Sequence, residues 1–155
     1  MIRIIGDGGH ASVVKEIVRL TFMDRPTSGA FVAIGDNKAR KKEAESNGGP
    51  FAVLVHPSAI VSDSASIGEG SIIMAGAIIQ PHASIGRHVI VNSGATLDHH
   101  CIIGDYAHIA PGAHLCGAVH VGEGTLVGVG VGIAPQTTIP SWSIVKAARL
   151  DVQSV

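Results

Sequence analysis

Aliphatic residues recur at every sixth position along residues 61–145. Counting in steps of six from Val61 to Val145 meets an isoleucine, a leucine or a valine each time, without a gap. A small or slim residue stands two places before each of them, such as Ala59, Ala95 and Cys101. An amphipathic helix has a period of about 3.6 residues and a half-buried strand a period of about two, so neither explains this pattern.

A repeat of six residues predicts a left-handed parallel β-helix, which has the shape of a triangular prism. Each unit forms one short strand and one corner, and three units close one coil, so residues three units apart stack on neighbouring coils. The fifteen units between Val61 and Val145 therefore give five coils. The aliphatic residues point into the prism, and we expect the turn-favouring residues of the repeat to form its corners. These are Gly68, Gly86, Asn92, Gly104, Gly122 and Gly128.

Residues 1–57 lack the repeat and predict a small α/β unit. The segment MIRIIG predicts a buried strand, and DGGHASVVKEIVRL a glycine turn followed by a helix. AFVAIGDN predicts a second strand, KARKKEAES a second helix and FAVLV a third short strand. We therefore expect a small Rossmann-like α/β domain over residues 1–57 that covers the first coil. The β-helix follows over 58–146, and a C-terminal tail or cap over 147–155.

Composition narrows the partners and the compartment. The chain is 46% hydrophobic but only 3% aromatic, so its core must be built from aliphatic residues. Its formal net charge of −1 offers no basic surface for nucleic acid or anionic lipid. No uncharged apolar run approaches the roughly 20 residues of a membrane span, and no secretion signal precedes IRIIG. We expect a cytoplasmic protein without a nucleic-acid or membrane partner, and reduced thiols at Cys101 and Cys116.

Nine histidines raise the question of a metal site. Only His82 and His100 are three units apart, so only these two stack on one face of the prism. His108, His114 and His120 follow one another at single-unit spacing and therefore project from three different faces. A three-histidine zinc site within one chain is not expected, which argues against a γ-type carbonic anhydrase. We predict no metal.

His99 is the candidate with catalytic neighbours. It lies two positions beyond inward-facing Leu97, on the outer surface, where a lone histidine is simply solvated. Asp98 could orient or charge-stabilise its imidazole, and Gly117, one coil further on, could aim a backbone N–H at a reacting carbonyl. A general base and a backbone donor are the minimum for acyl transfer.

Several motifs carry a family resemblance. These are NSGATLDHHCIIGDYAHIAPGAHLCGAVHVGEGTLVGVGVGI, the preceding HPSAIVSDSASIGEG, and the N-terminal GDGGHASVV with VAIGDN. The chain resembles, over nearly its whole length, the bacterial sugar acyltransferases that include sialic acid O-acetyltransferases and N-acetyltransferases of nucleotide-linked 4-amino sugars. The resemblance implies a homotrimer of prisms with active sites between subunits, and acetyl-CoA as the cosubstrate.

The resemblance also implies roles for single residues. His99 matches the general base, and His108 a second site histidine near acetyl-CoA. Gly117 matches the backbone amide at the thioester oxygen. His10 matches a histidine near the acceptor sugar. The remaining matches are in the sugar-nucleotide domain. Gly6, Gly8 and Gly9 match the loop that binds the phosphates, although these glycines could instead form a simple strand-to-helix turn. Asn37 matches a residue of the substrate site.

The chain departs from the family pattern at three places. The acid that usually follows the base is replaced by His100, so Asp98 is the remaining candidate for a supporting carboxylate. The segment between the first helix and the second strand is short, which leaves Asp24 as the candidate for the acidic contact with the nucleotide. The usual Gly-x-Pro-Ala segment is absent after Val145.

The leading hypothesis is an acetyl-CoA-dependent N-acetyltransferase that acts on the amine of a nucleotide-linked amino sugar. The imidazole group titrates near neutral pH, which suits His99 as the base that takes the proton of the amine. One alternative is O-acetylation of a sialic acid or a related sugar. Another is a non-catalytic trimeric scaffold that has lost its acceptor site.

Overall fold

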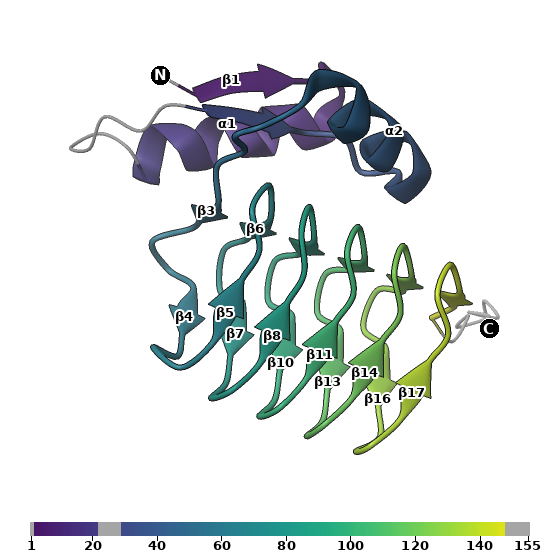
Figure 1. Cartoon of the computed structure of the whole chain (residues 1–155). Coiled ribbons are helices and arrows are strands. Elements are labelled where there is room, and N and C mark those ends of the chain that lie inside the picture. Colours follow the sequence, from purple (N-terminus) through teal and green to yellow (C-terminus); the bar gives the residue numbers. More distant parts are fainter. Residues whose placement is uncertain (1, 22–28, 148–155) are drawn as a thin grey trace, which may run out of the picture.

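A computed structural model describes residues 2–21 and 29–147 and confirms the predicted prism (Figure 1). Its strands are two residues long and form three parallel sheets, which are the three faces of the prism. The first face consists of β4 (Ile60–Val61), β7 (Ile78–Ile79), β10 (Thr96–Leu97), β13 (His114–Leu115) and β16 (Gly132–Ile133). The second consists of β5 (Ser66–Ile67), β8 (Ser84–Ile85), β11 (Ile102–Ile103), β14 (His120–Val121) and β17 (Thr138–Ile139). The third consists of β3 (Leu54–Val55), β6 (Ile72–Ile73), β9 (Ile90–Val91), β12 (His108–Ile109), β15 (Leu126–Val127) and β18 (Ile144–Val145).

The register is the one that the repeat predicts. Residues three units apart are direct partners, as in Ile78↔Thr96 and Thr96↔His114. The second residue of most strands points inward, and Leu97, Ile109 and Leu115 are almost completely buried. Packing of such aliphatic residues in successive layers supplies the core without aromatic side chains.

The corners differ from the prediction. A residue with positive φ occurs at every sixth position from 70 to 142, which is two places after the predicted turn residues. Six of these corner residues are glycines, and seven are not: His82, His88, His100, Tyr106, Ala118, Gln136 and Trp142. The predicted glycine Gly68 has another function, because a Cβ there would lie 2.5 Å from the carbonyl oxygen of Gly86 on the next coil. Close approach of the coils therefore explains that glycine, and the left-handed corners direct histidine and aromatic side chains outward.

The N-terminal unit is a βαβ motif with one further helix. β1 (Ile2–Ile5) pairs in parallel with β2 (Gly29–Val32), and α1 (Gly9–Thr21) lies between them in the sequence. α2 (Asn37–Asn47) follows, and the carboxylate of Asp36 caps it by accepting from the N–H of Ala39. Ala11, Val14 and Ile17 form the buried side of α1.

The third predicted strand belongs to the prism. β3 pairs with β6 rather than with β2, although the bridge between Ala30 and Phe51 keeps the preceding residues at the α/β sheet. The domain boundary at residue 57 stays a prediction, and the first strand of the third face lies before it. The last predicted segment, 147–155, lies outside the described residues except for Ala147.

The α/β unit packs on the first coil, as expected, but it also extends along the third face beyond that coil (Figure 1). α1 and β2 pack on Leu54, Ile72 and Ile90 in one shared core. Arg40 of α2 is fully buried and fastens the unit to the prism. Its guanidinium donates to the carbonyl oxygens of His88 (2.9 Å) and Tyr106 (2.7 Å) at two successive corners.

Candidate active site

His99 and Gly117 lie together at the edge between the first and second faces. His99 follows β10 at a corner, and Gly117 occupies the same corner one coil further on. A Cβ on Gly117 would lie 2.6 Å from Cε1 and 2.7 Å from Nε2 of His99, so only glycine leaves room for the ring. In the described part of the chain no acceptor takes the N–H of Gly117. The arrangement thus brings an exposed imidazole next to the backbone of Gly117 on the neighbouring coil.

Asp98 supports the backbone of His99 and does not contact its ring. The Oδ1 atom of Asp98 accepts a hydrogen bond from the backbone N–H of His99 at 2.7 Å. The partner of the ring is His100, since the two Nδ1 atoms lie 3.1 Å apart. The expected orientation of the imidazole by a carboxylate is therefore absent among the described residues. We name His82, His99, His100 and Gly117 the edge cluster, because His82 packs on His100 with ring centroids 5.0 Å apart.

His108 and His10 lie elsewhere, between the third face and the α/β unit. His108 is on β12, and the Nδ2 of Asn92 is 3.1 Å from its Nε2. The pKa of His108 is lowered to about 4, mainly by burial and further by the charges of Arg40 and His10. A backbone hydrogen bond with Gly35 raises the pKa but does not outweigh these effects. This histidine is neutral at neutral pH and therefore a weak base.

His10 shares this environment. It stands in the first turn of α1, and burial followed by the charge of Arg40 lowers its pKa to about 4. Its Nε2 atom is buried, and no hydrogen-bond partner for it occurs among residues 2–21 and 29–147. A buried and unpaired ring nitrogen is costly, so His10 is suited to bonding a polar group that enters from outside.

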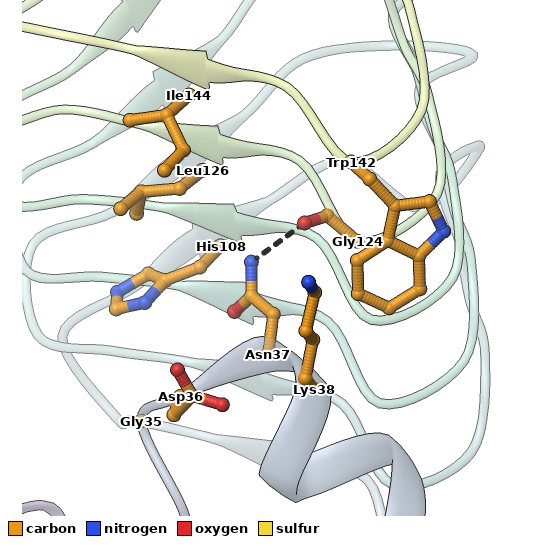
Figure 2. Close-up of a pocket in the computed structure, with 9 residues that line it drawn as sticks. All are labelled: Gly35, Asp36, Asn37, Lys38, His108, Gly124, Leu126, Trp142 and Ile144. Atoms are coloured by element: carbon orange, nitrogen blue, oxygen red, sulfur yellow. Dashed lines mark hydrogen bonds between the residues drawn. The ribbon is translucent and has the colours of Figure 1, made fainter.

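A pocket of about 330 Å³ opens where α2 meets the later coils of the third face (Figure 2). His108 and Trp142 stand on opposite sides of it, and Asn37 lies between them. The side chain of Asn37 is engaged with the protein, because its Nδ2 donates to the carbonyl oxygen of Gly124 at 3.0 Å and its Oδ1 accepts from Arg40 at 2.8 Å. We call this the face pocket; its lining is Gly35, Asp36, Asn37, Lys38, His108, Gly124, Leu126, Trp142 and Ile144.

A second pocket, of about 440 Å³, surrounds the glycine loop after β1. It is lined by residues 6–10, which include the predicted Gly8, Gly9 and His10, and by residues 33–35 after β2. In the described part of the chain the N–H groups of Gly9 and His10, at the start of α1, have no acceptor, which favours an anion such as phosphate. Gly35 lines both the glycine-loop pocket and the face pocket, so the two pockets are neighbours.

The predicted site residues thus form two groups on different sides of one chain. His99, Asp98 and Gly117 belong to the edge between the first and second faces, whereas His108, His10 and Asn37 belong to the third face and its domain. Asp24 lies outside the described residues. Within these residues, no group of three or more His, Cys, Asp or Glu side chains is placed to hold a metal ion, and no helix is long and apolar enough to cross a membrane.

Sequence reasoning missed two residues that the structure places at these sites, Trp142 and Lys38, which line the face pocket. It noted His100 beside the base but did not predict its bond to the ring of His99. Trp142 and His100 occupy left-handed corners, so the six-residue phase of the corners would have identified them as outward-pointing side chains.

Known proteins share this architecture. The family pattern described as bacterial transferase hexapeptide (six repeats) matches residues 64–99 and 82–117. The chain is 40% identical to UDP-N-acetylbacillosamine N-acetyltransferase of Bacillus subtilis (strain 168), over an alignment of 110 positions that covers 48% of this chain and 51% of the relative. The chain therefore spans about half the length of that curated relative.

Two solved structures match nearly all of the chain. The acetyltransferase domain of PglB from Neisseria gonorrhoeae FA1090 has a TM-score of 0.86 and 33% identity, covers 94% of this chain and 88% of its own, and is also known in complex with acetyl coenzyme A. PerB from Caulobacter crescentus, in complex with CoA and GDP-perosamine, has a TM-score of 0.85 and 36% identity and covers 94% of this chain and 86% of its own. Because these matches extend over both the α/β unit and the prism, the chain belongs to the hexapeptide-repeat family of sugar acyltransferases, as the sequence motifs indicated.

Proposed function

We propose that this chain transfers the acetyl group of acetyl-CoA to the amine of a nucleotide-linked amino sugar. The observation that carries the proposal is the contact between the imidazole of His99 and the backbone of Gly117. The comparisons support it, since PglB is known with acetyl coenzyme A and PerB with CoA and GDP-perosamine.

In the proposed reaction the neutral amine attacks the carbonyl carbon of the thioester. Nε2 of His99 takes a proton from the amine as the C–N bond forms, and the N–H of Gly117 stabilises the oxyanion. The C–S bond then breaks, and the sulfur leaves as a thiol with the proton returned from His99. The products are the N-acetyl sugar and CoA, so no oxidant or metal is required.

His99 is favoured as the base over the other two candidates. Burial lowers the pKa of His10 and of His108 to about 4, so both bind a proton only weakly at neutral pH. His99 is exposed at the surface of the chain and can meet a substrate there. His10 and His108 then serve as neutral hydrogen-bonding groups for the acceptor and for the acetyl end of the cosubstrate.

The two pockets suit the two ends of a nucleotide sugar. The glycine-loop pocket offers the free N–H groups of α1 to the phosphates, and the adjoining face pocket offers polar and apolar walls to the sugar. Lys38 adds a positive charge at the face pocket. Because Gly35 lines both pockets, we assign the two parts of one nucleotide sugar to them.

A second copy of the chain completes the site in this proposal. The base lies at one edge of the prism and the face pocket on another side, so the two groups of one chain do not meet. In a cyclic trimer the edge of one copy faces the third side of the next, and each site takes residues from two copies. This assembly matches the homotrimer that the family resemblance implies.

The test is a release assay. The purified protein is incubated with acetyl-CoA and with UDP-, dTDP- or GDP-linked 4-amino sugars, and free CoA is measured. We expect release with one of these sugars and a mass increase of one acetyl group on that sugar. Release without any acetylated sugar, or no release with every sugar of the panel, contradicts the proposal.

A further inference from the structure

We propose that His100 is a positioning residue that holds His99 in the tautomer with a proton on Nδ1 and none on Nε2. The inference rests on the proposed function, because it concerns the group that we assign as the base. It goes beyond that function by naming what orients the base in a site where no carboxylate contacts the ring.

The contact between the two rings requires a defined proton. The Nδ1 atoms of His99 and His100 lie 3.1 Å apart, and the ring planes are 81° from each other. Two imidazole nitrogens at this distance form a hydrogen bond only if one carries a hydrogen and the other does not. Either His99 or His100 is therefore the donor.

The proposed role of His99 selects the donor. Nε2 of His99 faces the place that a side chain at Gly117 would occupy, and Nδ1 faces His100. A base that takes a proton on Nε2 must hold its own hydrogen on Nδ1 while the ring is neutral. His99 thus donates through Nδ1, and His100 carries its own proton on Nε2, which is free to reach solvent because His100 is exposed.

The backbone fixes both rings in this relation. The carbonyl oxygen of His99 accepts from the N–H of Ala118 (2.9 Å), and the N–H of His100 donates to the carbonyl oxygen of Pro81 (3.1 Å). His100 has a φ of 58°, a left-handed conformation that non-glycine residues rarely adopt. The corner therefore turns the side chain of His100 back toward its neighbour.

Three other side chains lie near the rings of His99 and His100. Asp98 uses one carboxylate oxygen on the backbone of His99, and His82 packs on the far side of His100. Cys116 precedes Gly117 on the next coil. A neutral imidazole accepts the Nδ1 hydrogen but stabilises the protonated ring less than a carboxylate would, because it carries no charge.

Three variants at position 100 separate these effects. His100→Gly keeps the left-handed corner and removes the acceptor, so kcat is expected to fall by about 10-fold or more. His100→Asn places an amide oxygen the same number of bonds from the backbone as Nδ1, and Asn tolerates the left-handed conformation. It is expected to regain most of the lost kcat. His100→Asp adds a charge at this point and is expected to move the acid limb of the pH–rate profile to higher pH.

A matched control tests the corner itself. Gln136 has the same left-handed conformation, with a φ of 58°, on the same edge two coils further on. Gln136→Gly is expected to leave kcat within about twofold of the parent protein. Equal losses in Gln136→Gly and His100→Gly would assign the effect to the corner and overturn the inference.

Nitrogen-15 NMR of the histidine rings gives a readout that does not depend on activity. Spectra of the full-length protein are recorded above neutral pH, and the His99 signals are assigned by their loss in His99→Gln. We expect a protonated Nδ1 and an unprotonated Nε2, and a mixture of tautomers in His100→Gly. The opposite tautomer of His99 overturns the inference even if the protein transfers acetyl groups. A missing CoA release with the expected tautomer overturns only the proposed function.

Discussion

The imidazole of His99 lies over the Cα atom of Gly117, which belongs to the next coil. The ring occupies the space that a side chain at position 117 would need, since a Cβ there would lie 2.6 Å from Cε1 of His99. The candidate base and the candidate backbone donor are therefore adjacent because the coils stack in register, and each depends on the other for its position.

Gly117→Ala is expected to displace the ring of His99 without changing the fold. Gly117 does not have a positive φ, so alanine fits its backbone, but the methyl group must push the exposed ring outward. A displacement of about 1 Å is expected to lower kcat by about 100-fold. Steady-state kinetics and thermal unfolding check this. Gly132→Ala is the control, because a Cβ at Gly132 meets nothing within 4 Å; equal activity of the two variants would contradict the prediction.

His99→Ala is expected to remove the base and little else. Loss of general-base catalysis corresponds to a decrease of kcat by about 10²–10⁴-fold. The side chain is exposed, so the midpoint of thermal unfolding is expected to stay the same. Calorimetry compares the binding of acetyl-CoA by His99→Ala and by the parent protein. An unchanged kcat would exclude His99 from the mechanism.

Mixed assemblies test whether each site uses two copies. His99→Ala lacks the base but keeps the face pocket, whereas His108→Ala keeps the base and alters the pocket. If both are inactive alone, random trimers from an equal mixture are expected to recover about one quarter of the parental activity, because that fraction of sites receives both intact parts.

The control for this experiment mixes His99→Ala with Gly117→Ala. Both changes affect the same edge cluster, so no mixed site receives an intact cluster and no recovery is expected. Absence of recovery in the first mixture, with exchange of subunits verified by mass spectrometry, would show that one copy holds the whole site.

Arg40→Met is expected to weaken the attachment of the α/β unit. Arg40 is fully buried and donates to the carbonyl oxygens of Ile34, Gly35, His88 and Tyr106 and to the side chain of Asn37. The apolar substitute leaves these acceptors without donors, so the free energy of unfolding is expected to fall by about 3–5 kcal/mol. Chemical denaturation measures the change.

Lys42→Met is the control for Arg40→Met. Lys42 lies on the same helix but is exposed, so its replacement is expected to change the free energy of unfolding by less than about 0.5 kcal/mol. Similar changes in both variants would mean that the hydrogen bonds of Arg40 do not hold the unit in place.

Stability is expected to decrease in mild acid through His108. Burial lowers its pKa from 6.5 to about 4, so the unfolded chain binds the proton more strongly than the folded chain between these values. The stabilisation is complete above pH 6.5 and is lost as the pH falls toward 4, with a total on the order of 3 kcal/mol. Urea unfolding near pH 7 and near pH 5 measures it. His108→Asn is expected to show a weaker pH dependence, and an unchanged dependence would contradict the assignment.

The six-residue repeat predicted much of the fold. An aliphatic residue at every sixth position determines the strand length, the inward direction and the stacking of residues three units apart, because these follow from local periodicity. The proximity of His99 and Gly117 is predictable for the same reason. The position of the left-handed residue within each corner was not predictable from the sequence. Glycine is needed at some positions for positive φ, as at Gly124, and at others for close approach of the coils, as at Gly68, so a glycine does not by itself mark the left-handed position.

The sequence by itself determined the prism, its five coils, the family, the proximity of His99 to Gly117 and the stacking of His82 on His100. Only the tertiary structure decided where the α/β unit rests, because that depends on the core it shares with the third face and on a buried guanidinium that reaches carbonyl groups of distant corners. It also decided that Asp98 bonds the backbone while His100 bonds the ring of His99. Such choices depend on side-chain directions, which are set by the conformation of each corner and leave no period in the sequence.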